Sequence, residues 1–269
     1  MGARELTALA ALLWTAVLCA PAPALTAREL LDQAKQLDDT TRHWTDRTQR
    51  MSLDIFTARG DQRRRELVAY TKRYPGGEEK SISFILVGAE VKGVGLLQWA
   101  HKGRDDEQWL YLPELKRTRQ VAARLRDESF VGTAFTYRDL EILGELLHWS
   151  EDEAATKLLG EDPVGGHPCH MIELRPQQED VPYPRIVVWM DGERLTPRKL
   201  DFFDRSGTRV KGLTLDDVRD LGAIPTAHRL EMQTLTTGSH TLVTLTEVAY
   251  STGLADDLFT QRQLERGAP

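Results

Sequence analysis

Most of the chain carries short runs in which apolar and polar residues alternate, the pattern of half-buried β-strands. The clearest pair is 227–236 and 240–249, two runs rich in Thr, Val and Leu that Thr237-Gly238-Ser239 joins as in a β-hairpin. The other strand-like runs are 51–55, 66–74, 81–87, 96–101, 108–112, 117–122, 170–174, 185–191, 197–203 and 210–218. Separated by turns, they predict one antiparallel sheet that is strongly curved or partly closed.

Three segments have helical spacing instead. In the first, Thr26 to Arg50, the residues Thr26 and Glu29 have the spacing of a capping box. Its apolar stripe consists of Leu30, Leu31, Ala34 and Leu37. Shorter helices are expected over Phe135 to Gly144 and around Asp256 to Leu264. The predicted fold class is therefore mainly β with helices (α+β).

The N-terminus resembles a secretory signal peptide. Arg4 precedes an apolar run from Leu6 to Leu18, and Ala22-Pro23-Ala24 supplies small residues for cleavage. The run is shorter than the ~18 residues that span a bilayer. Lipidation of Cys19 is disfavoured because Leu18 stands where a small residue is expected. We expect residues 1–24 to be removed and residues 25–269 to form a single domain.

Charge and cysteine content restrict the possible partners and sites. The formal net charge of −6 argues against nucleic acid as a partner. After cleavage only Cys169 would remain, so an internal disulfide and a zinc site with several cysteines are both excluded. We expect a monomer that is held together by its core and by the hydrogen bonds of its sheet.

Two clusters of polar residues have metal-binding or acid–base potential. Asp105-Asp106-Glu107 lies in a turn, where consecutive acids point in different directions, so a solvated turn is favoured over a catalytic or calcium site. In His167-Pro168-Cys169-His170, a strand would place His167 and Cys169 on one face and His170 on the other. A half-buried cysteine beside surface histidines is favoured, and no metal site is predicted.

Sequence signatures of catalysis are missing. No Gly-x-Ser-x-Gly elbow, Walker loop or dinucleotide fingerprint occurs. Lys92-Gly93-Val94-Gly95 is not a dinucleotide fingerprint, because it lacks the third glycine and the helix that would follow. We therefore predict a protein that is not an enzyme. A hydrolase without a known signature stays open as an alternative.

Aromatic residues gather in the middle of the chain, at Trp99, Trp109, Tyr111, Phe130, Phe135 and Tyr137. Trp109 and Tyr111 are two residues apart in a strand and so share a sheet face. Core packing explains such a cluster most simply. The alternative is an apolar cavity covered by Phe130 to Leu143, with Gly132-Thr133 as a bend or hinge.

A basic segment lies in the same region of this acidic chain. Its members are Lys116, Arg117, Arg119, Arg124 and Arg126. It could contact an anionic lipid headgroup or an acidic partner. A solvated face is the simpler interpretation, because two acids follow at once.

The central region also resembles a known family, the outer-membrane lipoprotein-sorting proteins of the LolA-like class, in the branch found beside RND-type lipid exporters. The matching motifs are Phe84, Val91-Lys92-Gly93, Leu97-Gln98-Trp99, a run within Asp106 to Arg117 and a run within Ser129 to Leu140. The likeness extends over roughly Leu30 to Glu247 and is densest in these motifs. One departure is Ala134, where the family commonly has an acid, so any contact made by that acid is in doubt here.

The resemblance implies an unclosed β-barrel around a hydrophobic cavity, with helices as a lid. It implies a periplasmic carrier of lipid or acylated lipoprotein, without cofactor or metal, with an RND-type exporter as donor. An accessory subunit that docks on the exporter without carrying cargo is an alternative. The residues expected to bind lipid are Trp99, Trp109, Tyr111, Phe130, Phe135, Tyr137 and Leu140. Those expected to meet a headgroup or partner are Lys116, Arg117 and Arg119.

Overall fold

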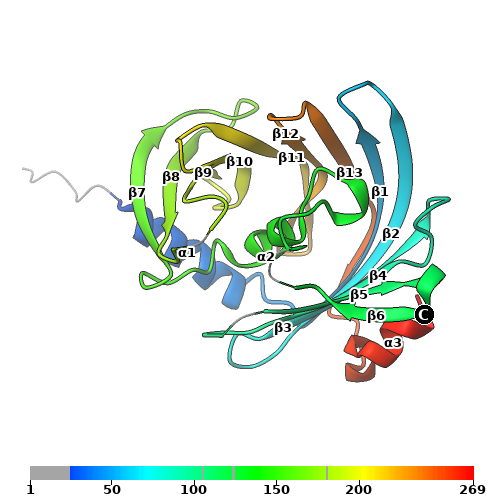
Figure 1. Ribbon diagram of the computed structural model, residues 1–269. Helices are drawn as coiled ribbons and strands as arrows, with labels where there is room; N and C mark the ends of the chain where they lie inside the picture. Colours follow the sequence, from blue (N-terminus) through cyan, green and yellow to red (C-terminus); the bar gives the residue numbers. More distant parts are fainter. Residues whose placement is uncertain (1–24, 105, 123–124, 180) are drawn as a thin grey trace, which may run out of the picture.

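The computed structural model describes residues 25–269 except 105, 123–124 and 180. Its strands form one sheet of 13 strands in the order β6-β5-β4-β3-β2-β1-β13-β12-β11-β10-β9-β8-β7. The sheet curls into an unclosed barrel whose edges are β6 and β7 (Figure 1). This confirms the predicted fold class.

The strands form two antiparallel meanders that meet at β1 and β13. In the first, each strand pairs with the next along the chain. Its strands are β1 (Asp46–Phe56), β2 (Gln62–Arg73), β3 (Glu79–Val87), β4 (Gly95–Ala100), β5 (Glu107–Leu112) and β6 (Arg117–Gln120). The second returns to β1 and consists of β7 (Ala154–Glu161), β8 (Cys169–Pro176), β9 (Arg185–Asp191), β10 (Pro197–Phe203), β11 (Arg209–Leu221), β12 (Ile224–Thr234) and β13 (Ser239–Tyr250). The predicted hairpin at 227–249 is β12 and β13, whereas β7 was not predicted.

The first helix, α1, begins with the predicted capping box but is shorter than predicted. It covers Ala27–Asp39, and both Thr26 and Glu29 make the reciprocal capping hydrogen bonds. The prediction of a helix as far as Arg50 is wrong, because β1 already begins at Asp46. The buried Asp46 carboxylate accepts hydrogen bonds from the backbone N–H groups of Thr252 and Gly253. Pairing with β13 and these hydrogen bonds of Asp46 hold the segment in the sheet.

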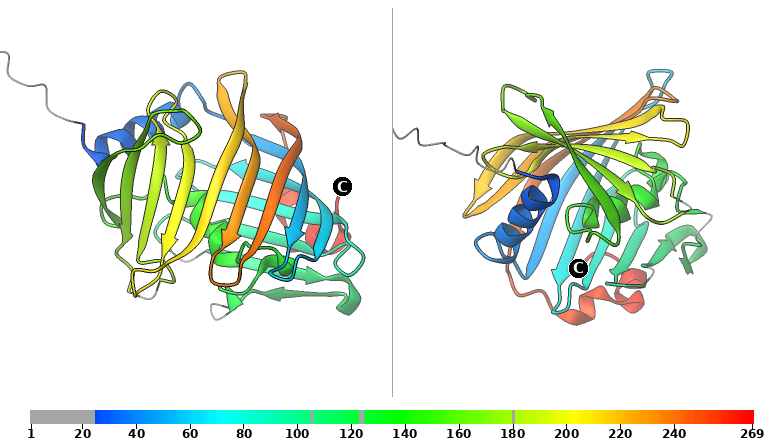
Figure 2. Two further views of the ribbon diagram at one scale, coloured as in Figure 1. Left: turned by 90° about the horizontal axis from the view of Figure 1, so that it is seen from above. Right: turned by 90° about the vertical axis from the view of Figure 1, so that its left-hand side faces the viewer.

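Two further helices lie on opposite sides of the sheet. The second helix, α2 (Tyr137–Glu145), lies within the curve of the sheet and confirms the helix expected near residues 135–144 (Figure 1). The third, α3 (Gln261–Arg266), follows the short helix η4 (Asp256–Phe259) and lies outside the curve, beside β4 to β6 (Figures 1 and 2). Within the described residues, no helix has both the length and the apolar character needed to cross a membrane.

The alternation of side chains along the strands builds an apolar cluster on each face. The concave cluster joins residues of most strands to α1 and to the segment around α2. The convex cluster is smaller and consists of residues from β2 to β5 under Phe259 and Leu264. Neighbouring residues of one strand divide accordingly: on β4, Leu96 belongs to the concave cluster and Leu97 to the convex one.

Candidate functional site

Residues 129–149, which we call the α2 segment, cover much of the apolar concave face. Phe130, Phe135 and Leu146 of this segment are buried in the concave cluster, each at most 7% exposed. In this structure the protein's own side chains therefore occupy the part of the apolar interior that lies under this segment. The apolar hollow expected from the resemblance would open only when this segment moves away from the sheet.

A buried polar network fastens the start of α2 to the opposite half of the barrel. The Lys211 ammonium on β11 pairs with the Asp139 carboxylate, and Tyr183 Oη donates a 2.9 Å hydrogen bond to Asp139 Oδ1. Asp139 also accepts from Thr136 N at 2.7 Å, as the N3 residue of a capping box. Asp139 is fully buried and Lys211 is 6% exposed. The pair is therefore shielded from solvent and from screening ions.

The Ala134 position contributes its backbone to the same network. Lys211 Nζ donates to the Ala134 carbonyl at 3.1 Å, and Ala134 N donates to Thr241 Oγ1 on β13 at 2.9 Å. The departure from the family pattern at this residue therefore removes a carboxylate but leaves backbone contacts that hold the segment to the sheet.

The segment turns sharply before α2. Val131 has φ 43° and Gly132 has φ 79°, both in the left-handed region. Thr133 Oγ1 donates to the Phe130 carbonyl at 2.8 Å and accepts from Phe135 N at 3.2 Å, which fixes the turn. The bend expected at Gly132-Thr133 is present, and Gly132 adopts its φ without the strain of a Cβ.

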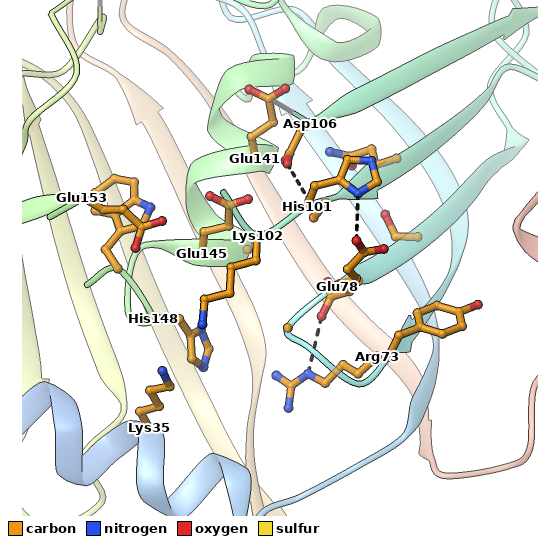
Figure 3. A pocket seen from close by; sticks show the side chains of 18 of the residues that line it. Lys35, Arg73, Glu78, His101, Lys102, Asp106, Glu141, Glu145, His148 and Glu153 are labelled. Atoms are coloured by element: carbon orange, nitrogen blue, oxygen red, sulfur yellow. Dashed lines mark hydrogen bonds and ion pairs between the residues drawn. The ribbon is translucent and has the colours of Figure 1, made fainter. Parts of the chain in front are cut away.

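One cavity of about 360 Å³ opens beside the α2 segment, between the end of α1, α2 and the turns after β2 and β4 (Figure 3). This volume lies within the usual range of small-molecule sites, roughly 300–1,000 Å³. Most of its lining residues are polar or charged, among them Lys35, Arg73, Lys102, Asp106, Glu141, Glu145 and His148. Charged side chains and apolar atoms thus both face the open space.

Carboxyl groups of the cavity are held in a partly dehydrated cluster. Burial raises the pKa of Glu141 to about 7, although Arg126 and Arg138 oppose the shift. Burial, and next the charge of Asp106, raise the pKa of Glu145 to about 8. The pKa of Asp106 is raised by burial as well. The prediction that the acidic turn is solvated is wrong for Asp106, which accepts a hydrogen bond from His101 N at 3.1 Å, while Asp105 lies outside the described residues.

The structure divides the predicted lipid-binding residues between the two faces. Phe130, Phe135, Tyr137 and Leu140 lie on the concave side, and Leu140 lines the cavity. Trp99, Trp109 and Tyr111 lie in the convex cluster. Trp99 Nε1 donates to the Phe259 carbonyl at 3.1 Å, and the Trp99 and Trp109 rings meet edge to face at 4.9 Å. A ligand on the concave face would contact only the first group.

The basic segment is also divided. Lys116, Arg117 and Arg119 are exposed on and beside the edge strand β6. Arg126 instead donates to the Asp106 carbonyl at 2.7 Å and pairs with Glu141 at 3.3 Å. Arg124 lies outside the described residues. Among the described members of the segment, Lys116, Arg117 and Arg119 are thus the ones exposed to a partner.

The remaining sequence candidates do not form a site. Cys169 is buried and unpaired, and its Sγ donates to the His167 carbonyl at 3.3 Å. No group of three or more His, Cys, Asp or Glu side chains within the described part of the chain has the geometry to hold a metal ion.

Lys211 and Tyr183 were missed by the sequence analysis. Lys211 precedes Leu213 by two residues in β11, so the two share the concave face and a lysine stands at a core position. A lysine at such a position indicates a buried acidic partner. That signal could have been found in the sequence, although it does not identify Asp139 as the partner.

Comparison with known proteins agrees with this architecture. A family model whose description reads "-like: Uncharacterized protein" matches residues 77–266, more than half of the chain. The search of curated proteins gave no match. A crystal structure of an outer membrane lipoprotein-sorting protein domain from Vibrio parahaemolyticus is 26% identical, with a TM-score of 0.80, and the match covers 89% of this chain and 100% of that one.

Two more distant structures share the fold. A DUF1329 family protein from Desulfovibrio piger is 24% identical with a TM-score of 0.81, over 88% of this chain and 97% of that one. A LolA superfamily protein from Nitrosomonas europaea is 17% identical with a TM-score of 0.66, over 89% of this chain and 100% of that one. The chain therefore belongs to the family that the matching model describes, within the LolA-like fold of outer-membrane lipoprotein-sorting proteins.

Proposed function

We propose that this protein is a periplasmic carrier of lipid or acylated lipoprotein between the inner and outer membranes, and not an enzyme. One observation carries the proposal: an apolar concave face extends over most strands, and the α2 segment, which covers much of it, is fastened to the sheet by a few polar contacts. The similar domain from Vibrio parahaemolyticus is named for lipoprotein sorting, which supports the same function here. Residues 1–24 would be the export signal and residues 25–269 the carrier domain.

Displacement of the α2 segment would create the binding site. Its apolar side chains would leave the concave face, and an acyl chain would take their place. Burial of hydrocarbon is worth about 0.8 kcal/mol for each methylene. An acyl chain of about 16 carbons therefore gains on the order of 12 kcal/mol before the costs of ordering and of opening the segment. The concave-face residues Phe130, Phe135, Tyr137 and Leu140 would meet the chain.

Bound cargo and its transfer test the proposal directly. Protein isolated from the envelope of its own cell under mild conditions should release lipid or acylated peptide on organic extraction, identified by mass spectrometry. The same protein should speed the movement of acylated cargo between two populations of vesicles. Protein that is isolated empty, and that transfers no lipid and no lipoprotein, would contradict the proposal.

A second candidate is a docking subunit of an RND-type exporter that carries no cargo. The exposed Lys116, Arg117 and Arg119 beside the free edge strand β6 favour it, because they offer positive charge to an acidic partner. Capture of an exporter by protein that holds no lipid, together with loss of capture when these three residues are replaced by Gln, would support it over the carrier.

A further inference from the structure

Arg65 on β2 is a buried cation that forms no ion pair with the described residues. Its side chain lies on the concave face, opposite Leu53 of β1, and the residue is only 5% exposed. Its Nη1 is buried and has no hydrogen-bond partner, and no ion pair to Arg65 is found among the described residues. The acid whose charge acts on it, Glu90, is paired with Arg63 at 3.7 Å. Burial, and next the charge of Arg63, lower the pKa of Arg65.

A buried guanidinium without an ion-pair partner is costly. A buried charge loses hydration that only a counter-charge or hydrogen bonds can replace. A buried Arg is therefore normally matched to a carboxylate or phosphate, which its planar fork binds through two hydrogen bonds. A group that matched Arg65 on the concave face of β2 would therefore be an anion.

The α2 segment covers the guanidinium of Arg65. A Cβ placed on Gly132 would lie 3.7 Å from Arg65 Nη2, so the turn at Val131-Gly132 lies directly over the guanidinium. Gly88, after β3, lies against the other side, where an added Cβ would be 3.2 Å from Arg65 Cγ. Movement of the α2 segment would uncover the guanidinium together with the apolar face.

The length of β2 between Arg65 and the polar cavity is sufficient for the hydrocarbon chain of an amphiphile. Arg65 lies near the start of β2, and Arg73, which lines the polar cavity, ends it. The eight residue steps from Arg65 to Arg73 correspond to about 26 Å at roughly 3.3 Å per residue. Acyl chains fill about 15 Å in each leaflet of a bilayer whose hydrocarbon core is about 30 Å thick. A hydrocarbon chain that starts at Arg65 therefore fits along the concave face.

We propose that Arg65 is the receptor for the acidic group, a carboxylate or phosphate, of an anionic amphiphile whose hydrocarbon chain lies along the concave face. This inference rests on the proposed carrier function and adds the chemical class of its cargo. The acid group binds the guanidinium after the turn at Val131-Gly132 has moved aside. Release of the amphiphile lets the turn close again over Arg65.

Binding of C16 amphiphiles to lipid-stripped protein tests this assignment. The probes are palmitate, hexadecyl phosphate, the uncharged hexadecanol and inorganic phosphate alone. We expect both anionic amphiphiles to bind at least tenfold more tightly than hexadecanol. Arg65→Gln should reduce that preference to less than twofold while leaving hexadecanol affinity unchanged, and Arg65→Lys should give an intermediate preference. The matched control is Arg64→Gln, because Arg64 lies on the other face of β2 and is largely exposed.

The thermal stability of the Arg65→Gln variant shows whether Arg65 binds a ligand or only supports the fold. Because Arg65→Gln removes an unpaired buried charge, the melting temperature of the lipid-stripped variant should equal or exceed that of the wild type, and palmitate should raise it less. A clear fall in melting temperature would overturn the receptor role. Equal affinity of wild-type protein for palmitate and hexadecanol would also overturn it, while leaving the carrier function intact. No binding of any amphiphile would overturn the carrier function as well.

Competition with inorganic phosphate shows whether Arg65 binds a free small anion or the acid group of an amphiphile. Phosphate that displaces palmitate at equal concentration, in an Arg65-dependent way, would assign the position to a free small anion and overturn the headgroup assignment. Displacement only by molecules that carry both an acid group and a hydrocarbon chain supports the amphiphile.

Discussion

Lys211 and Asp139 are 72 residues apart in the chain and form an ion pair inside the barrel. One belongs to a strand of the second meander and the other to α2, which follows the first meander. Apart from Tyr183 and the Ala134 carbonyl, the surroundings of this pair are largely apolar. The pair is thus a buried ionic contact between the α2 segment and the sheet.

Breaking this pair should destabilise the fold and loosen the α2 segment. Removal of one partner of a buried pair leaves an uncompensated charge and typically costs about 3–5 kcal/mol. We expect Asp139→Asn and Lys211→Met each to lower the free energy of unfolding by about that amount. Denaturant unfolding measures it, and hydrogen exchange of residues 137–146 should show faster local opening in both variants.

The double variant distinguishes pairing from simple loss of side chains. Asp139→Asn combined with Lys211→Met removes both charges, so its loss of stability should be smaller than the sum of the two single losses. Arg219→Met, which breaks the exposed pair with Asp217, is the control and should leave stability unchanged. Additive losses at Asp139 and Lys211 would show that the two side chains act independently.

The stability of the closed form should fall as the pH rises. The folded protein holds protons on Glu141 and Glu145 with pKa values of about 7 and about 8, against an ordinary value of 4.5. At pH values between the ordinary pKa and the raised pKa of each group, the folded state therefore binds more protons than the unfolded state. The contribution of each group is fully present below 4.5 and is lost as the pH rises through its folded pKa. The contribution of these two groups to the melting temperature should decrease from about pH 5 to about pH 9.

Glu145→Gln should remove a large part of this decrease, because the amide keeps the shape of the protonated acid and does not ionise. Glu153→Gln is a suitable control at the same cavity. The backbone N–H of Ser150 lowers the pKa of Glu153, so its contribution is lost only at lower pH, as the pH falls through the folded value. If Glu145→Gln and wild type lose stability equally between pH 6 and 9, roughly the window of these two groups, the assignment is wrong.

Local patterns in the sequence identified much of the sheet and which side chains share a face. Trp109 and Tyr111 do lie on one face, as their spacing predicted. The spacing does not say which layer covers that face, because Phe259 and Leu264, which pack on it, come from the C-terminus. The buried network around Asp139 depends on contacts across the barrel, and β7 has charged and small residues that weaken its strand pattern. These features arise only when the sheet curls.

The convex cluster should serve stability and not binding. A Cβ on Gly95 would lie 2.7 Å from Leu264 Cδ1 and 3.1 Å from Phe84 Cδ1, so Gly95→Ala would push α3 away from the sheet. Overpacking of this kind typically costs about 1–3 kcal/mol. We expect a lower melting temperature and unchanged affinity of the folded protein for palmitate. Reduced affinity would mean that Trp99, Trp109 and Tyr111 take part in binding from the convex face.

The hydrogen bond between Ala134 and Thr241 should control how fast cargo enters and leaves. Thr241 is fully buried, and its Oγ1 is the acceptor for Ala134 N at 2.9 Å. Thr241→Val keeps the shape of the side chain but leaves that N–H unsatisfied in the closed form, at a cost of about 1–3 kcal/mol. When the α2 segment is displaced, the N–H regains solvent, so the substitution favours the open form. Each 1.4 kcal/mol corresponds to about a tenfold change in the opening equilibrium.

We therefore expect Thr241→Val to speed the release of a fluorescent fatty acid, measured by stopped flow, by roughly fivefold to a hundredfold. Thr244→Val is the matched control, since Thr244 is on the same strand but on the opposite face, and should leave the rate unchanged. Equal release rates for wild type and Thr241→Val would mean that opening of the α2 segment does not limit release. The acyl chain would then leave along a route that does not break the contact between Ala134 and β13.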